Sequence, residues 1–383
     1  MTLDPVPDPT PDLTTARAAF KAFVEPIPRD ASVVALHDSD ADGLSAGVLW
    51  QRGLERLGFS SIRRLLPDRQ RSAWSEGNRE TIKQAAPDRL FVLDLGSQPE
   101  PVLPGVSTCF VDHHRPGGAP PGDTLVSAYT WDPIPTTSLL TWELFAGLTD
   151  MADLDWIAAI GLLGDLGDSA PFPMLTEAKK RYTAKYLKEA VALLNAARRV
   201  ARYDPEAAAR ALLAHDDPRS LVNSDSADVQ TLRAAREEVK MAMEEAKKAA
   251  PVFAGEVALI RASSPCQIHP LVAQIWRTRL PKFIVLAAND AYLPGRVNFS
   301  ARAARGVNVL EFLRSVPLPP GEGNFGQGHD QASGGSLPVA RWNALLAALG
   351  FAPDVFAYEN AGRRSPRVET QGTQVPSVQG TQD

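Results

Sequence analysis

Residues 32–43 read SVVALHDSDADG, and residues 108–114 read TCFVDHH. In both stretches a run of apolar and β-branched residues ends in acids and histidines. Such runs are typical of buried strands in a parallel sheet, and residues 44–57 space their apolar side chains as an amphipathic helix does. Both clusters therefore lie where a strand leads into a helix. Because ligands of open α/β sheets bind outside the carboxyl ends of the strands, we expect these acids and imidazoles to converge, as in a two-metal site.

Composition limits the class of protein. The chain has 383 residues, 44% of them hydrophobic, which is enough for two or three domains with buried cores. Two cysteines are too few for a disulfide framework, and no apolar run is long enough to span a bilayer. Residues 1–20 lack the basic and apolar regions of a secretory signal. We therefore expect a soluble cytoplasmic protein that makes no contact with membranes.

The charge pattern bears on the partner. The net charge of −5 argues against a protein whose whole surface grips long nucleic acid, because phosphate contacts require lysine and arginine. Residues 275–314 differ, with seven basic residues against two acids. This segment is either a solvated basic face or a phosphate-binding surface.

The pattern along the chain predicts two α/β units. Strands are expected at 33–36, 62–66, 90–93 and 109–111, with helices at 45–56 and 79–86. Helices are expected over 136–166 and 176–202, a polar linker at 216–226 and an unbroken helix at 227–250 about 35 Å long. The second unit has strands at 257–260, 283–287 and 297–299, helices at 270–279, 308–314 and 338–349, and a glycine-rich loop at 321–335.

The predicted fold is therefore α/β: a parallel-sheet domain joined by a long helix to a smaller α/β domain. We expect a catalytic domain over 1–215, a linker and connecting helix over 216–250, a substrate-binding domain over 251–350 and a largely disordered tail over 351–383.

The acids are candidates for metal ligands. Asp38, Asp40 and Asp42 alternate, so at least two of their carboxylates can face one point, although a single capping aspartate would be structural. Asp94 ends another strand, where a lone acid is more often a cap. In residues 161–168 glycines interrupt an apolar helix, and either Asp165 or Asp168 could be the metal ligand. Carboxylates with imidazoles and no thiolate favour Mn²⁺ or Mg²⁺ over structural Zn²⁺.

The second unit offers groups for a phosphate. The run 296–302 alternates polar and apolar residues, so Arg296, Asn298, Ser300 and Arg302 would share one face of a strand. Residues 326–335 read GQGHDQASGG and offer unblocked backbone N–H groups, a nest that suits a phosphate or carboxylate.

These motifs, in this order, resemble the DHH phosphoesterase family. Residues 38–43, 93–94, 112–114 and 161–165 are similar to its four metal motifs, and 297–302 with 326–335 are similar to its companion DHHA1 domain. One departure lies in Gly326-Gln327-Gly328-His329. Here Gln327 separates the two glycines, whereas the family often has consecutive glycines before the histidine.

The resemblance implies a two-domain enzyme that hydrolyses phosphodiester or phosphoanhydride bonds between its domains, with two Mn²⁺ ions and Mg²⁺ as an alternative. The implied ligands are Asp40 and Asp94, with His37 or Asp38 nearby, for one ion, and Asp42, Asp94, His113 and Asp165 for the other, with Asp94 bridging. His114 would meet the scissile phosphate, and Asp112 would orient the histidine pair. The implied substrate contacts are Arg296, Ser300, Arg302, Gly326, Gly328 and His329.

The leading functional prediction is a Mn²⁺-dependent phosphodiesterase or exonuclease. In this interpretation a hydroxide held between two ions attacks short oligonucleotides, or linear or cyclic dinucleotides, and releases mononucleotides. The alternative is a RecJ-like 5′-to-3′ exonuclease on single-stranded DNA, favoured by the long helix and the arginines of 275–314. A pyrophosphatase and an inactive binding scaffold are weaker alternatives, since every acid and histidine that the mechanism needs is present.

Overall fold

Five parallel strands form the sheet of the first lobe. This computed structural model describes residues 10–304, 306–319, 321, 323–329 and 331–355. The strands are β1 (Val33–His37), β2 (Ile62–Leu65), β3 (Arg89–Leu93), β4 (Thr108–Asp112) and β5 (Thr124–Ser127). Their order is β2-β1-β3-β4-β5. Every residue of β1 and β4 is buried, which explains their continuous apolar composition.

Helices cover both faces of this sheet. The first helices are α1 (Leu13–Val24), α2 (Ala41–Arg56), α3 (Glu76–Gln84), α4 (Thr137–Ala146), η1 (Ala152–Leu154) and α5 (Asp155–Asp165). On one face, Phe20, Trp50 and Phe145 of α1, α2 and α4 join a large apolar core with Phe91 of β3. On the other face Ile82 of α3 belongs to a smaller core with strand residues. The sheet is therefore buried on both sides, as a parallel sheet requires.

A helical layer completes the first lobe and leads to the second. It contains α6 (Pro173–Tyr182), α7 (Ala184–Ala197), α8 (Pro205–Leu213), α9 (Pro218–Asn223) and α10 (Ala227–Ala246). The helix expected over 176–202 is broken at Thr183, whose φ is 71°. The segment 216–226, expected to be a polar linker, contains the short helix α9. Pro218 starts this helix without losing a hydrogen bond, and Asp217 caps it by accepting from two backbone N–H groups.

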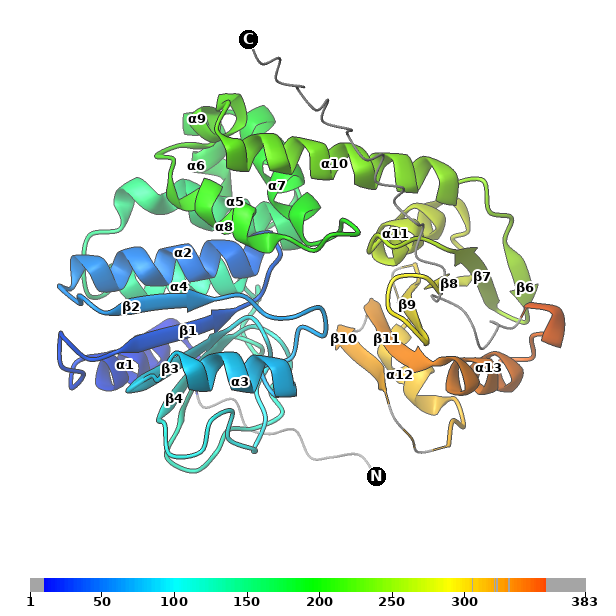
Figure 1. Ribbon diagram of the computed structural model, residues 1–383, viewed down its shortest axis with the longest axis horizontal. Helices are drawn as coiled ribbons and strands as arrows, with labels where there is room; N and C mark the ends of the chain where they lie inside the picture. The colour runs from blue at the N-terminus through cyan, green and yellow to red at the C-terminus, as the bar shows by residue number, and fades with distance from the viewer. Residues whose placement is uncertain (1–9, 305, 320, 322, 330, 356–383) are drawn as a thin grey trace, which may run out of the picture.

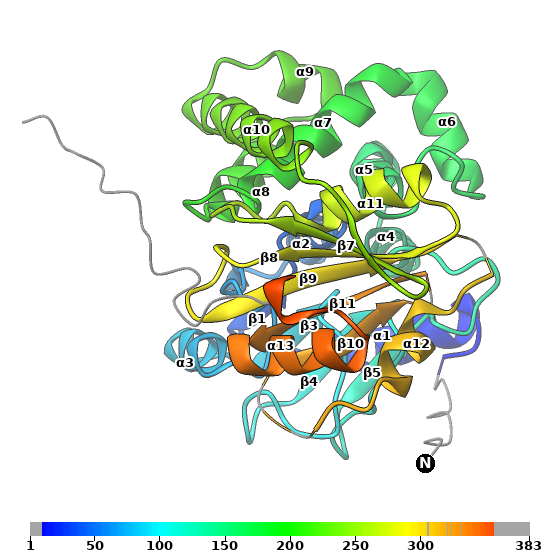
Figure 2. The same cartoon turned by 90° about the vertical axis from the view of Figure 1, so that its right-hand side faces the viewer.

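The second lobe is built on a six-stranded mixed sheet. Its strands are β6 (Val252–Ala254), β7 (Val257–Ala262), β8 (Ile284–Asn289), β9 (Arg296–Arg302), β10 (Asn324–His329) and β11 (Ala332–Pro338). Its helices are α11 (His269–Arg279), α12 (Val309–Ser315), α13 (Val339–Ala348) and η2 (Pro353–Val355). Figure 2 looks onto this lobe, in which the order is β10-β11-β9-β8-β7-β6. Helix α11 packs on one face, while α12 and α13 pack on the other.

The glycine-rich segment is part of this sheet, so the expectation of a loop at 321–335 is wrong. Strands β10 and β11 pair antiparallel with a bulge between Phe325 and Gln327, and Gly326 at the bulge has a φ of 63°. At Gly334 a Cβ atom would collide with the carbonyl oxygen of Phe299 on β9. Glycine is therefore used here for close strand packing and for a bulge.

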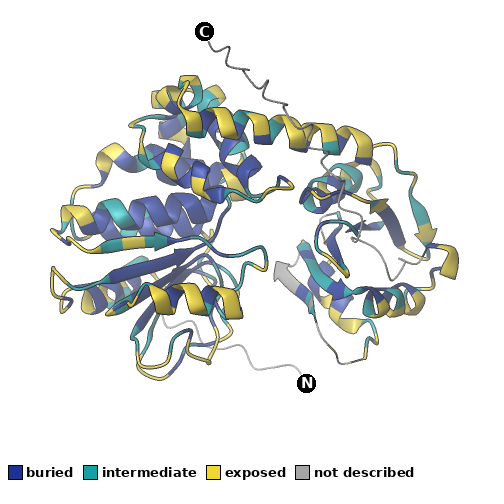
Figure 3. Cartoon of the chain, viewed as in Figure 1, coloured by how far each residue is buried: buried dark blue, intermediate teal, exposed yellow. Residues whose placement is uncertain are grey.

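Helix α10 spans the two lobes (Figure 1). Its 20 residues, at about 1.5 Å each, reach about 30 Å. Near its start, Val229 and Leu232 belong to the core of the first lobe. Further along, Val239 and Met243 join a cluster with residues of β7, β8 and α11. Figure 3 shows its outer side exposed, so the helix connects the two cores along its inner side.

The predicted fold class, a parallel-sheet domain joined by a long helix to a smaller α/β domain, is confirmed. Both cysteines are buried free thiols. Among the described residues, none of the helices combines the length and the apolar character that crossing a bilayer requires. The predicted tail lies outside the described residues from position 356 onward.

Candidate metal centre

Three adjacent strands deliver the acids to one edge of the first sheet. Asp38 follows β1, Asp94 follows β3 and Asp112 is the last residue of β4. Strands β1 and β3 are neighbours, and the chain order reverses between them. Such a switch point opens a crevice at the carboxyl ends of the strands, and this crevice is the usual ligand site of a doubly wound sheet.

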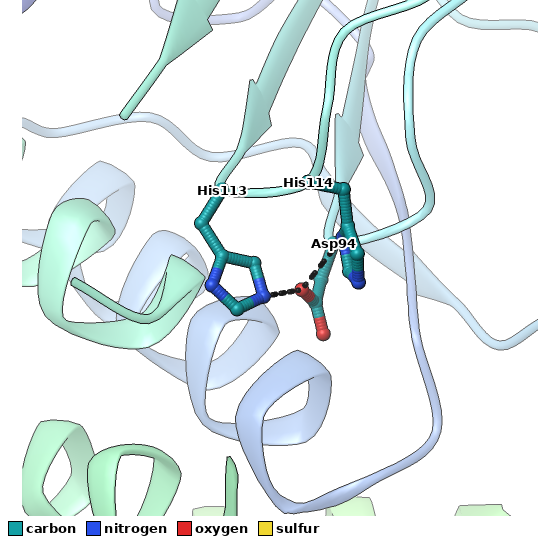
Figure 4. Close-up of side chains that lie close together, drawn as sticks. All are labelled: Asp94, His113 and His114. Carbon is teal, nitrogen blue, oxygen red and sulfur yellow. Dashed lines mark ion pairs between the residues drawn. The ribbon is translucent and has the colours of Figure 1, made fainter. Parts of the chain in front are cut away.

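Asp94 belongs to two groups of side chains that could each hold a cation. One group is Asp38, Asp40 and Asp94, and the other is Asp94, His113 and His114; within each, the potential ligand atoms lie within 4.8 Å of one another. Figure 4 shows the Asp94 carboxylate facing both imidazoles. Its Oδ1 lies 3.5 Å from Nε2 of His113 and 3.8 Å from Nδ1 of His114. A carboxylate shared in this way suits a pair of metal ions.

Asp94 is held in an unfavourable state that a cation would relieve. Its φ of 64° lies in the left-handed region, which residues other than glycine, asparagine and aspartate seldom adopt. Burial raises the pKa of Asp94 well above its usual range, and the charges of Asp42, Asp40 and other nearby acids raise it further. The hydroxyl of Thr137 donates to Asp94 Oδ1 over 2.8 Å. The donor set, rich in carboxylate oxygen with imidazole nitrogen, therefore fits Mn²⁺ or Mg²⁺.

Asp42 ties the first turn of α2 to the start of α4. Its two oxygens accept the backbone N–H groups of Thr137, over 2.8 Å, and Ser138, over 3.0 Å. Burial raises the pKa of Asp42 to about 6, although His113 opposes the rise. Gly161 of α5 lies so close that a Cβ atom there would collide with Asp42 and Ser138. Asp42 therefore fixes the relative positions of three helices beside the site.

The two histidines face the site through different atoms. His113 Nδ1 contacts the Pro135 carbonyl over 3.1 Å, which directs Nε2 toward Asp94. His114 Nδ1 donates to Asp112 over 2.7 Å. Burial disfavours the charged form of His114, but Asp112 outweighs burial and raises the pKa of His114 to about 9. Asp112 also accepts the N–H of Gly96 over 2.5 Å, so it orients His114 from a fixed position.

The structure distinguishes the two acids that the spacing left open. Asp165 ends α5, and its Oδ2 lies 3.7 Å from Nε2 of His113. Asp168 instead forms ion pairs of 2.8 Å with Lys179 and Lys188 on the surface. Asp165 is therefore the acid that reaches the site.

His37 is placed apart from the metal-capable groups. Its ring is buried between β1 and α2, where it packs against Gly47. Its Nδ1 lies 2.8 Å from the carbonyl oxygen of Asp38, and burial lowers the pKa of His37 to about 3. Neither of the two groups found among the described residues includes it.

Two arginines at the site were missed from the sequence. Nε of Arg71 donates to Asp38 over 2.7 Å, and its Nη2 contacts Asp40 over 3.2 Å. Arg198 lies 3.5 Å from Asp40, which also caps α2 by accepting from two backbone N–H groups. Arg71 comes from the loop between β2 and α3, and Arg198 follows α7 directly. Neither position carries a local signal, because only the tertiary fold brings them to the acids.

The second lobe turns part of β9 toward this centre. Burial lowers the pKa of Arg302 and Arg277 lowers it further, while Asp165 of the first lobe opposes the fall, so Arg302 lies within electrostatic range of the metal centre. Arg296 lies at the other end of β9, where it donates to the Ser336 hydroxyl over 2.9 Å and so holds β11.

The other predicted substrate contacts also lie on the β9-β11-β10 strands. Ser300 pairs with Gly334, and Arg302 with Ala332. Ala332 pairs in turn with His329, and Ser333 with Gly328. The backbones of Gly328 and His329 are thus placed, whereas the side chain of His329 lies outside the described residues. Gly326 is buried at the bulge, next to Arg314.

Positive charge from both lobes gathers around His269, the first residue of α11. Burial and, to a smaller extent, the charges of Arg198, Arg199, Arg71 and Arg302 together lower the pKa of His269 to about 3. Nε of Arg198 and Nε of Arg199 are buried without a hydrogen-bond partner in the described part of the chain. Buried arginines beside a carboxylate cluster suit a phosphate group that lies between them.

Comparison with known proteins identifies a curated relative of similar sequence. No protein family model matches the chain. The single-stranded-DNA-specific exonuclease RecJ of Thermus thermophilus is 27% identical over 371 residues, which cover 86% of this chain and 53% of RecJ. The chain thus spans about half the length of this curated relative.

Solved structures share the fold. The crystal structure of the same RecJ with Mn²⁺ matches with a TM-score of 0.65 at 21% identity, over 89% of this chain and 55% of RecJ. A structure of exonuclease RecJ bound to manganese matches with a TM-score of 0.60 at 20% identity, over 95% and 99% of the two chains. The DHH domain of a member of the s1p family of ribosomal proteins has a TM-score of 0.60 at 16% identity, over 88% of each chain.

Proposed function

We propose that this chain is a member of the DHH phosphoesterase family and a Mn²⁺-dependent nuclease that hydrolyses single-stranded nucleic acid from an end. The observation that carries the proposal is the sharing of Asp94 between two metal-capable groups, one of which contacts Arg71 and Arg198. We assign catalysis to 1–215, the connection to 216–250 and substrate binding to 251–350, with the tail over 351–383.

The carboxylates and His113 would hold the metal ions. Asp38, Asp40 and Asp94 would hold one ion, and Asp94, His113 and Asp165 the other, with Asp42 close behind them. When bound, the ions supply an activated water and neutralise charge on the phosphate in an in-line displacement. Mg²⁺ is the alternative ion, since the same oxygen-rich set suits it.

His114 is the group best placed to act on the substrate. Its ring is about one-third exposed, whereas His113 is almost fully buried. The hydrogen bond from Nδ1 to Asp112 directs the opposite ring edge away from that carboxylate. In this position His114 would stabilise developing charge on the phosphate or protonate the leaving oxygen.

The arginines would bind a phosphate of the nucleic acid. Arg302 comes from the second lobe, and Arg198 and Arg199 from the end of α7 in the first. A phosphate between the lobes would be contacted from both sides, so these arginines would hold the scissile bond at a fixed distance from it. Ser300, Gly328 and His329 are the further contacts that we propose on this side.

Two substrates fit this arrangement. Single-stranded DNA is supported by the resemblance to RecJ in sequence and fold. Short oligonucleotides or dinucleotides are supported by the net charge of −5, which leaves little overall attraction for a long strand.

Product analysis separates the two. The protein with Mn²⁺ is given an equimolar mixture of a 5′-phosphorylated dinucleotide and 5′-labelled single-stranded DNA of about thirty nucleotides, which is longer than a compact site. Faster loss of the dinucleotide supports the short substrate, and shortening of the DNA supports the RecJ-like one. If neither is hydrolysed, with Mn²⁺ or with Mg²⁺, the proposed function is wrong.

A further inference from the structure

Arg69 lies between two tyrosines that belong to different lobes. It is in the loop between β2 and α3 of the first lobe. Its guanidinium carbon lies 5.8 Å from the ring centroid of Tyr203 and 5.3 Å from that of Tyr292. Tyr203 precedes α8 in the first lobe, whereas Tyr292 is in the β8–β9 loop of the second. Both distances are within the range of cation–π attraction, so Arg69 connects the lobes.

Hydrogen bonds fasten the same loop to the first lobe. Nη2 of Arg69 donates to the carbonyl of Ala201. The hydroxyl of Tyr203 donates to the carbonyl of Pro67 over 2.8 Å. The loop and the segment before α8 are therefore bound to each other twice, and the position of Arg69 is well defined.

Tyr292 is equally fixed in the second lobe. It is 4% exposed, and its ring lies 5.9 Å from that of His269. The loop that carries it begins at Asn289, which is fully buried and hydrogen-bonds to residues 264 and 266. A buried ring on an anchored loop gives Arg69 a rigid partner.

The loop of Arg69 also supplies Arg71, which contacts Asp38 and Asp40 of the metal centre. Only one residue separates the two arginines, so displacement of Arg69 would move Arg71. We propose that Arg69 is a positioning residue: by binding between Tyr203 and Tyr292 it couples the approach of the second lobe to the placement of Arg71 at the metal centre. The catalytic consequence rests on the proposed function.

The lobes have a separate attachment that would survive the loss of Arg69. Helix α10 packs with α11, β7 and β8 in a shared apolar cluster. The N–H of Gln267 donates to the carbonyl of Arg199 over 2.7 Å. Removing Arg69 should therefore leave the protein folded and the lobes attached. The distance between the lobes beside the metal centre should become more variable.

The test measures lobe separation and kinetics in the full chain. Nitroxide labels are placed at Lys83→Cys on α3 and Ser315→Cys at the end of α12, both exposed, and the native cysteines are buried. Pulsed electron spin resonance then gives the distribution of distances between the lobes. The variants are Arg69→Ala, Tyr292→Leu and Tyr292→Phe, and the control is Arg63→Ala, an exposed arginine of β2.

We expect Arg69→Ala and Tyr292→Leu to broaden the distance distribution and to raise KM about tenfold, with kcat reduced less than about threefold. Tyr292→Phe keeps the ring and should behave as the wild type, as should Arg63→Ala. An unchanged distribution in Arg69→Ala, or equal effects of Phe and Leu at position 292, would overturn the inference. If the wild type hydrolyses no nucleic acid, the proposed function fails, while the distance measurement still decides whether Arg69 holds the lobes together.

Discussion

The two lobes present polar side chains to their junction in different ways. In the first lobe the acids follow the carboxyl ends of β1, β3 and β4, where the topology of a parallel sheet brings them together. In the second lobe Ser300 and Arg302 stand on β9 itself, so their direction depends on the pairing register with β8 and β11. Strand ends are fixed by the fold, whereas a strand face is reversed by a shift of one residue.

The polar side chains of the two lobes also differ in how firmly neighbouring groups hold them. Asp42 and Asp112 accept backbone N–H groups, and Asp94 accepts the Thr137 hydroxyl, so these carboxylates are held before any ligand binds. Arg302 is half-buried and faces another arginine, Arg277. We therefore expect changes to these carboxylates to affect the chemical step and metal binding, and changes to Arg302 to affect substrate binding.

The largest effect is expected from Asp94→Asn. Asparagine tolerates the left-handed backbone at this position, so the fold should survive while the shared negative charge is lost. Turnover with Mn²⁺ should fall about a thousandfold or more, the scale of losing a group that stabilises the transition state. Asp168→Asn, which removes a surface acid, is the control. Circular dichroism checks the fold, and Mn²⁺-dependent turnover close to the wild-type rate would exclude Asp94 as the shared ligand.

Addition of Mn²⁺ should stabilise the first lobe in particular. A ligand that binds only the folded state at about 100 times its Kd adds about 2.7 kcal/mol to the free energy of unfolding. Hydrogen exchange with and without Mn²⁺ should show the added protection around β1, β3 and β4, with less in the second lobe. The Asp94→Asn variant should lose most of this gain. Equal protection of both lobes would contradict the assignment of the ions to the first.

Gly161→Ala tests how tightly the first lobe is packed behind its ligands. The added methyl group would collide with Asp42 and Ser138, and overpacking of this kind costs about 1–3 kcal/mol. Gly77→Ala in α3, where the nearest atom is the Asp68 carboxylate at 3.2 Å, should change stability by less than about 1 kcal/mol. Urea unfolding measures both. If the two variants are equally stable, the close contact at Asp42 is not a constraint.

The smallest effect is expected in the second lobe. Arg302→Ala should raise KM about tenfold and change kcat much less, because the side chain would bind the substrate without taking part in the chemical step. Arg261→Ala, an exposed arginine at the end of β7, should leave both constants near their wild-type values. Steady-state kinetics on the substrate found by product analysis gives the answer. A fall in kcat at constant KM would place Arg302 with the catalytic groups.

Sequence patterns predicted the first lobe better than the second, because strand ends carry local signals whereas strand pairing depends on residues far apart in the sequence. Strand ends marked by acids, such as Asp38 and Asp94, can be found locally, and so can the helix that follows β1. The hairpin β10–β11 was expected to be a loop, because glycine disfavours strands in isolation and is required here only by the approach of β9 at Gly334. Arg69, Arg71 and Arg198 had no local signal, since their partners lie far away in the sequence.

We propose that Asp94 is shared by two metal ions. Anomalous diffraction at the manganese edge, from crystals grown with Mn²⁺, tests it directly. We predict two peaks about 3.5–4 Å apart on either side of the Asp94 carboxylate, one near Asp38 and Asp40 and the other near His113 and Asp165. A single peak, or two peaks of which only one touches Asp94, would contradict the account.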